Sequence, residues 1–286
     1  MTWWEAVVLG VIQGVTEFLP ISSSAHIRVI GPLLPSGGDP GAAFTAVIQI
    51  GTEAAVLVYF WKDIVRIVGE WFRALGGRDG RGWRDRMGAH SADARMGWFV
   101  ILGSVPIVVL GVIFKDSIET ALRNLYLTAI VLAVFGLVLG WADRVGAKQR
   151  ELRDLRARDV AVLGFAQAAA LIPGVSRSGG TISAGLFLGL TREAAARFSF
   201  LLAIPAVLGS GFFELATEWH ELTAPHGPGL AATVIAAVVA FGVGYVVIVW
   251  FLRLLKSGSY VPFVVYRVAF AGLIIGLLAA GALSAT

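Results

Sequence analysis

Long apolar runs alternate with short polar segments along the chain. Six of these runs approach or exceed the length of about 20 residues that a helix needs to cross roughly 30 Å of hydrocarbon. They are residues 41–61, 97–114, 125–142, 194–216, 229–252 and 261–283. Two further apolar regions, residues 4–34 and 159–190, are interrupted in the middle by Pro20 and Pro173 respectively. Because each half of these regions is short for a span, we expect each region to form a helix, a turn and a returning helix.

The distribution of arginine and lysine predicts how these elements cross the membrane. Basic residues concentrate in residues 62–96 and 143–158 and in the turn that carries Arg253 and Lys256. Residues 217–228 contain neither arginine nor lysine. Loops rich in these residues stay on the cytoplasmic side of the membrane. We therefore expect the three basic segments inside the cell, and residues 217–228 and both termini outside.

With this orientation, the two interrupted regions must enter the membrane from opposite sides, residues 4–34 from the outer face and residues 159–190 from the cytoplasm. Each half of the chain, about 1–142 and 159–283, then holds one hairpin and three crossings, and the halves are inverted. Such repeats occur in many transporters, whose broken helices meet near the midplane. The fold class expected is an all-α polytopic membrane protein with six transmembrane helices plus two re-entrant helical hairpins. We expect the whole chain to form one integral membrane domain with a cytoplasmic linker at 143–158, and both hairpin turns to line one polar cavity.

The composition agrees with a membrane protein and excludes an ordinary soluble one. Of the 286 residues, 57% are hydrophobic and only 15% are charged, whereas soluble domains average about 25% charged residues. The absence of cysteine excludes disulfides and thiolate metal ligands. The start of the chain lacks a basic segment and a small-residue cleavage site, so we expect no cleaved signal peptide. We also expect no nucleic-acid partner.

The turn of the first hairpin concentrates polar residues inside apolar sequence. Gln13 and Glu17 are four residues apart and lie on one face of a helix. Three serines that can cap the returning helix follow Pro20, and a histidine lies on the next turn; these are Ser22, Ser23, Ser24 and His26. An ionisable side chain at membrane depth costs about 2.5 kcal/mol or more, which favours a functional site. The alternatives are an interfacial loop and a structural pair between Glu17 and an arginine.

The turn of the second hairpin has the composition of an anion site. Arg177 lies among small residues and hydroxyls immediately before an apolar helix. Its neighbours are Ser176, Ser178, Gly179, Gly180 and Thr181. Glycines let backbone N–H groups approach a ligand, a helix N-terminus adds partial positive charge, and arginine offers a fork that suits phosphate oxygens. The segment is not a P-loop, because no Gly-Lys-Ser/Thr follows at the required spacing.

Together the two turns combine a carboxylate, a histidine and serines with an arginine and a glycine-rich segment. This combination suits phosphoryl chemistry on a lipid, where catalysis consists mostly of positioning and of neutralising oxygen charge. An amphiphilic substrate could place its headgroup in the polar cavity and leave its tail in the bilayer. The main alternative is a flippase or transporter of an isoprenyl phosphate carrier lipid, with the buried acid and histidine as proton relays. A structural scaffold would leave the buried polar groups unexplained.

Three motifs support a family resemblance. Gln13–Glu17, Pro20–His26 and Pro173–Gly180 resemble the signature motifs of the undecaprenyl-diphosphate phosphatase family, the bacitracin-resistance proteins. The similarity covers essentially the whole chain, including Phe198–Pro205 and Tyr260–Phe263. It implies a multi-pass hydrolase of the bacterial plasma membrane that removes the terminal phosphate of undecaprenyl diphosphate, recycling the lipid carrier for peptidoglycan synthesis. It further implies bacitracin resistance, a divalent cation (Mg²⁺ or Ca²⁺), a homodimer and an active site open to the outer face.

The resemblance also assigns roles to individual residues. The family's essential acid, serine, histidine and arginine fall on Glu17, Ser23, His26 and Arg177. Gln13 stands where some members have a glutamate, which removes one carboxylate from a two-carboxylate metal site. We therefore expect Glu17 and the amide oxygen of Gln13 to bind the cation. The expected substrate-binding residues are Gln13, Ser22, Ser24, Ser176, Ser178, Gly179, Gly180 and Thr181.

The identity of the nucleophile stays open at this point. Either Ser23 or His26 could attack the terminal phosphorus, or His26 could activate the attacking group. A second superfamily of lipid phosphatases uses a Pro-Ser-Gly-His pattern, a later Ser-Arg and a distal histidine. Ser176-Arg177 matches part of that pattern, but no histidine follows at the right spacing, so we set this class aside.

Overall fold

The computed structural model describes residues 1–36, 41–78, 80, 82–119, 122, 124–224 and 227–285. Within these ranges the protein is helical and contains no β-strand. The helices are α1 (Trp3–Phe18), α2 (Ser23–Ile30), α3 (Ala42–Tyr59), α4 (Trp61–Leu75), α5 (Trp83–Arg86), α6 (Ala92–Ile113), α7 (Lys115–Glu119), α8 (Leu125–Val145), α9 (Ala157–Ala168), α10 (Arg177–Phe187), α11 (Arg192–Thr217), α12 (Trp219–Thr223), α13 (Leu230–Leu254) and α14 (Val261–Ala279). Short 3₁₀ helices follow α2 and α9 and precede α9.

Five helices are long and apolar enough to cross a membrane, namely α6, α8, α11, α13 and α14. A sixth candidate is the pair formed by α3 and α4, which is bent by 78°. These helices coincide with the six apolar runs, so the prediction of a polytopic helical membrane protein is confirmed. No helix was predicted for residues 62–96, where the structure has α4 and α5. The apolar face of α6 is largely exposed, including Val105, Val108 and Val112, as lipid-facing side chains would be.

The chain reverses direction at the two proline-containing turns, as expected. α1 ends at Phe18, and Pro20 cannot continue the helical hydrogen bonding because it has no N–H. The second turn follows α9 and contains Pro173. In both turns the residue before the returning helix is a serine with a positive φ, 71° at Ser22 and 69° at Ser176. Positive φ is uncommon outside glycine and often accompanies functional sites.

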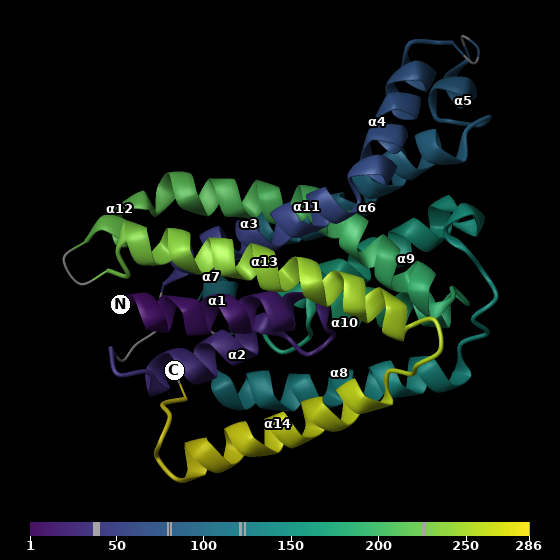
Figure 1. The fold of residues 1–286 in the computed structure, drawn as a ribbon. Coiled ribbons are helices and arrows are strands. Elements are labelled where there is room, and N and C mark those ends of the chain that lie inside the picture. The colour runs from purple at the N-terminus through teal and green to yellow at the C-terminus, as the bar shows by residue number, and fades with distance from the viewer. Residues whose placement is uncertain are drawn as a thin grey trace.

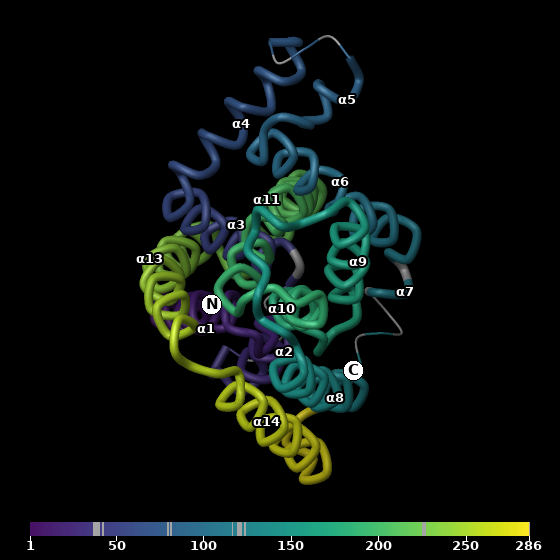
Figure 2. The backbone as a smooth tube through the Cα atoms, turned by 90° about the vertical axis from the view of Figure 1, so that its right-hand side faces the viewer, coloured from purple at the N-terminus to yellow at the C-terminus, as the bar shows by residue number. Residues whose placement is uncertain are grey.

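The two hairpins have corresponding packing partners. α1 packs against α13 and α9 against α6, while α3 packs on α11 and α8 on α14. In both hairpins a glycine permits close approach of the backbones. A Cβ at Gly10 would lie 2.5 Å from the carbonyl oxygen of Ala236, and one at Gly164 would lie 2.7 Å from that of Gly103. Figure 2 looks along the helices and shows α10 near the middle, with α8, α9 and α11 around it.

The two ends of the molecule differ in charge. Figure 1 shows both termini and α12 at one end, and α4, α5 and the connections α8–α9 and α13–α14 at the other. The basic segments 62–96 and 143–158 therefore share one end, and the loop at 217–228, which lacks arginine and lysine, begins at the opposite end. This is the separation that the charge distribution predicts.

Candidate active site

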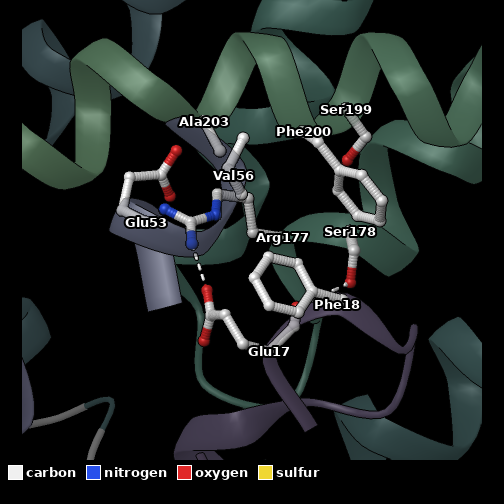
Figure 3. A pocket seen from close by; sticks show the side chains of 9 residues that line it. All are labelled: Glu17, Phe18, Glu53, Val56, Arg177, Ser178, Ser199, Phe200 and Ala203. Carbon is white, nitrogen blue, oxygen red and sulfur yellow. Dashed lines mark hydrogen bonds and ion pairs between the residues drawn. The ribbon is translucent and has the colours of Figure 1, made fainter. Parts of the chain in front are cut away.

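The two hairpin turns meet at a small buried cavity (Figure 3). Its wall comes from α1, α3, the start of α10, and α11. The lining residues are Glu17, Phe18, Glu53, Val56, Arg177, Ser178, Ser199, Phe200 and Ala203. The free volume is about 10 Å³, roughly the space of one water molecule. A diphosphate headgroup does not fit this conformation, so its entry requires the side chains to move apart.

Glu17 is the centre of the polar contacts. Its side chain is only 6% exposed. Its Oε2 accepts hydrogen bonds from Gln13 Nε2 at 2.8 Å and from Ser23 Oγ at 2.6 Å. Its Oε1 forms an ion pair with the Nη2 of Arg177, which lies 160 residues further along the chain. Glu17 thus brings together three of the predicted site residues, two from its own hairpin and one from the other.

The second turn is joined to the first by Ser178. Its hydroxyl donates to the carbonyl oxygen of Leu19 at 3.1 Å and lies 3.2 Å from the hydroxyl of Ser176. Ser176 caps α10 by accepting a hydrogen bond from the N–H of Gly179. The first turn of α10 therefore begins at Arg177 and is capped by Ser176.

Other predicted binding residues lie outside the cavity lining. The hydroxyl of Thr181 bonds to Ser199 on α11 and to the carbonyl of Arg177. Gly180 packs on α9, where a Cβ would lie 2.9 Å from the carbonyl oxygen of Ala166. The hydroxyls of Ser22 and Ser24 lie 3.2 Å apart. In this conformation the contacts of these four residues maintain the turns.

His26 is held next to the turn but has no hydrogen bond to Glu17 or Ser23 among the described contacts. Its Nδ1 lies 2.7 Å from the carbonyl oxygen of Ser22, and its Nε2 lies 2.7 Å from the hydroxyl of Tyr266. A carbonyl oxygen only accepts, so Nδ1 carries the proton, and Nε2 of the neutral ring accepts from Tyr266. The ring also stacks on Phe270 at 4.1 Å between centroids. Both ring nitrogens are therefore occupied.

Sequence reasoning missed Arg267 on α14, a fully buried arginine that binds both turns. Its Nη1 donates to the carbonyl of Pro20 at 2.9 Å, and its Nη2 donates to the carbonyls of Gly174 and Val175 at 2.8 and 3.1 Å. Its Nε donates to Leu132 on α8. Arg267 is the only charged residue in the predicted span 261–283, and this was a signal that could have identified it.

Glu53 on α3 was missed in the same way. It is the only charged residue in the predicted span 41–61, and its side chain is buried in the cavity wall. Its Oε1 has no hydrogen-bond partner in the part of the chain that the structure describes, and the same is true of Oε1 of Gln13. Oxygen atoms of this kind are the ligands that hard divalent cations take. The described residues contain no cluster of three histidine, aspartate or glutamate side chains.

Comparison with known proteins is consistent with this arrangement. The family model described as bacitracin resistance protein BacA matches residues 6–273. The chain is 58% identical over 286 residues to undecaprenyl-diphosphatase 2 of Agrobacterium fabrum, covering 100% of this chain and 99% of that protein. It is 54% identical over 289 residues to the undecaprenyl-diphosphatase of Micrococcus luteus, with 100% of both chains covered. The resemblance found in the sequence motifs is confirmed, and the chain belongs to the bacitracin resistance protein BacA family.

Proposed function

We propose that this protein is a membrane hydrolase that removes the terminal phosphate of undecaprenyl diphosphate and returns undecaprenyl phosphate to peptidoglycan synthesis. The observation that carries the proposal is the convergence of Gln13, Ser23 and Arg177 on the carboxylate of Glu17, inside an apolar helical protein. The names of the full-length relatives support the same substrate. The description of the family as bacitracin resistance proteins agrees with the resistance that the sequence motifs imply.

Substrate binding would replace one anion by another at Arg177. In the closed conformation its guanidinium pairs with Glu17. The terminal phosphate can take over that pairing and can also accept from the N–H groups at the start of α10, because both donors favour phosphate oxygens. Opening the pair enlarges the cavity and frees Oε1 of Glu17. The isoprenyl tail stays among the helices and lipid.

For the chemical step, the contacts favour Ser23 as the nucleophile. Its hydroxyl donates to Glu17 at 2.6 Å, the arrangement of a nucleophile and its general base. Ser23 Oγ would attack the terminal phosphorus as its proton passes to Glu17. The bond from that phosphorus to the bridging oxygen breaks, and undecaprenyl phosphate leaves. Water then attacks the same phosphorus, the bond to Ser23 Oγ breaks, and the proton held by Glu17 returns to Oγ. This releases inorganic phosphate, which keeps the protons of the water, and restores the hydroxyl.

His26 would act as a positioning residue in this scheme. Its Nδ1–H binds the carbonyl of Ser22, the residue with positive φ immediately before Ser23. Tyr266 holds the other ring nitrogen. The imidazole therefore fixes the backbone that carries the nucleophile, and its replacement would displace Ser23.

A divalent cation, Mg²⁺ or Ca²⁺, would be bound by Glu17 and the amide oxygen of Gln13, and the unpartnered Oε1 of Gln13 supports this assignment. When bound, such a cation neutralises charge on the phosphate oxygens and on the leaving group.

The paired features of the two hairpins support an inverted repeat with six crossings and two re-entrant hairpins. Gly10 and Gly164 each lie three residues before a buried glutamine, Gln13 or Gln167, and both approach a neighbouring backbone closely. The hydroxyl pairs Ser22–Ser24 and Ser176–Ser178 have the same separation of 3.2 Å. In this topology both termini and the opening of the site face outward.

We further expect a homodimer. Light scattering on the purified protein would measure its molar mass and so its oligomeric state.

The test is phosphate release from undecaprenyl diphosphate by the purified protein in detergent, where transport across a membrane is impossible. Wild-type protein should release phosphate, and Arg177→Ala should abolish turnover while remaining folded. Near-normal release by Arg177→Ala would contradict the assigned site. A flippase without hydrolase activity would release no phosphate in this assay.

A further inference from the structure

We propose that Glu53 supplies a second carboxylate to the divalent-cation site, across the cavity from Glu17. This inference rests on the cation-dependent phosphatase function proposed above. Figure 3 shows the guanidinium of Arg177 between the two carboxylates, with Glu53 on α3 and Glu17 at the end of α1. Glu53 is 1% exposed, so its carboxylate has been removed from water together with the rest of the site.

Among the residues that the structure describes, no arginine or lysine forms an ion pair with Glu53. Arg177 is the basic residue of the cavity lining, and its printed ion pair is with Glu17. No ion pair joins Arg177 to Glu53 within the described ranges. A buried charge is stable only when it is paired, hydrogen-bonded or bound to a metal. The partner of an ionised Glu53 must therefore come from outside the described protein contacts.

The hydroxyl groups of the cavity lining and of Thr52 already take part in hydrogen bonds. The hydroxyl of Ser178 is bonded to the Leu19 carbonyl, and the hydroxyl of Ser199 pairs with Thr181. The neighbouring Thr52 donates to the carbonyl of Gln49 in its own helix. These contacts leave Oε1 of Glu53 without a hydrogen-bond donor, so this oxygen is available to a cation.

The charges around the cavity also favour a divalent ion. When ionised, Glu53 adds a second negative charge to that of Glu17, against one positive charge on Arg177. When the phosphate takes Arg177, both carboxylates lose their nearest positive charge, and a divalent cation restores the balance. Hard cations prefer several oxygen ligands from carboxylates and amides. Once Arg177 has moved to the phosphate, Glu53, Glu17 and Oε1 of Gln13 would supply such a set from two helices that pack together.

The experiment measures Mn²⁺ binding to the purified full-length protein from the electron paramagnetic resonance signal of free Mn²⁺, with phosphate release measured in parallel. Glu53→Gln should weaken Mn²⁺ binding by at least about tenfold, the scale of a disturbed metal site, and should raise the Mn²⁺ concentration required for activity. The control is Glu193→Gln on α11, a carboxylate outside the cavity that lies 3.8 Å from Arg197. Its Mn²⁺ affinity should equal that of the wild type.

Unchanged Mn²⁺ affinity in folded Glu53→Gln overturns the inference, as does a wild-type protein that hydrolyses substrate without binding Mn²⁺. Failure of the proposed function looks different, because wild-type protein would then bind Mn²⁺ through Glu53 and release no phosphate. If Glu53→Gln is not recovered as a monodisperse protein, the Mn²⁺ affinity of Glu53→Asp tests the inference instead. This variant keeps the charge but withdraws the oxygens by one methylene, so weaker Mn²⁺ binding supports the ligand role and equal binding overturns it.

Discussion

At the scale of single residues, the site depends on how the two oxygens of Glu17 are shared. Oε2 receives Ser23 and Gln13 from its own hairpin, while Oε1 receives Arg177 from the other. The arginine can leave for a phosphate without disturbing the serine, because the two bind different oxygens. One carboxylate can therefore position the nucleophile and release the anion-binding group.

Replacing Ser23 by alanine tests the choice of nucleophile. We expect phosphate release to fall by at least about a thousandfold, the scale seen when a nucleophile is removed. Rapid quenching of the wild-type enzyme with labelled substrate should trap an acid-stable phosphoserine. An acid-labile adduct that persists in Ser23→Ala would instead identify His26 as the attacking residue. The hydrogen bond between Tyr266 and Nε2 of His26 would then have to break.

Much of this site could be predicted from the sequence, and the reasons for the gaps are physical. The helical spacing of Gln13 and Glu17 places them on one face, and their hydrogen bond follows from it. The pairing of Glu17 with Arg177 depends on how two distant hairpins pack, which no local pattern determines. Glu53 and Arg267 were visible as single charges in apolar spans, but their positions beside the turns depend on tertiary packing.

At the scale of helices, the two turns are held in register by Arg267. It donates to backbone carbonyls of both turns and of α8, and it is 0% exposed. Among the described hydrogen bonds, the guanidinium is the donor to the turn carbonyls of Pro20, Gly174 and Val175, whereas the carbonyl of Leu132 lies within α8. The residue therefore links the two halves of the site without lining the cavity.

Arg267→Met is expected to destabilise the protein strongly, because it leaves the three turn carbonyls of Pro20, Gly174 and Val175 without their donor. Losing one such group costs about 1–3 kcal/mol, so a loss of about 3 kcal/mol or more is expected for the set. Thermal unfolding in detergent measures it. Arg267→Lys should recover part of the loss, since an ammonium can reach some of these carbonyls but lacks the planar fork. Wild-type stability in Arg267→Met would show that the turns do not depend on this residue.

Gly10 tests the close packing of α1 on α13. A Cβ there would lie 2.5 Å from the carbonyl oxygen of Ala236, which is backbone and cannot rotate away. We expect Gly10→Ala to lower the unfolding free energy by about 1–3 kcal/mol through overpacking. Gly272→Ala on α14 is the matched control, because nothing lies within 4 Å of its Cβ position. The prediction fails if both variants unfold at the wild-type temperature.

The helices themselves were largely predictable, because a run of apolar residues of sufficient length has few alternatives in a bilayer. The returning helices were predictable from Pro20 and Pro173. α4 was missed because charged residues alternate with its apolar residues. This segment, rich in basic residues, was therefore interpreted as a cytoplasmic loop. Which helices pack together, such as α3 on α11, was not accessible to a pattern that is local in sequence.

At the scale of the whole molecule, the separation of charge between the two ends predicts the orientation in the membrane. The end that carries α4, α5 and the linker 143–158 holds most of the arginines and should face the cytoplasm. The opposite end holds the termini and α12. A substrate in the outer leaflet would then approach the site from the side of the molecule where α1 begins and α2 ends.

Single cysteines test this orientation without background, because the chain contains none. Ser36 is exposed beside the end of α2, and Ala89 is exposed near α5. Ala89 is preferable to the nearby Ser91, whose hydroxyl caps α6 and accepts from the N–H of Ala94. An impermeant maleimide added to intact cells should label Ser36→Cys, and should reach Ala89→Cys only after the membrane is opened. The reverse labelling pattern would show that the protein has the opposite orientation. The basic residues of segment 62–96 would then lie outside the cell, contrary to the rule that basic loops of membrane proteins stay in the cytoplasm.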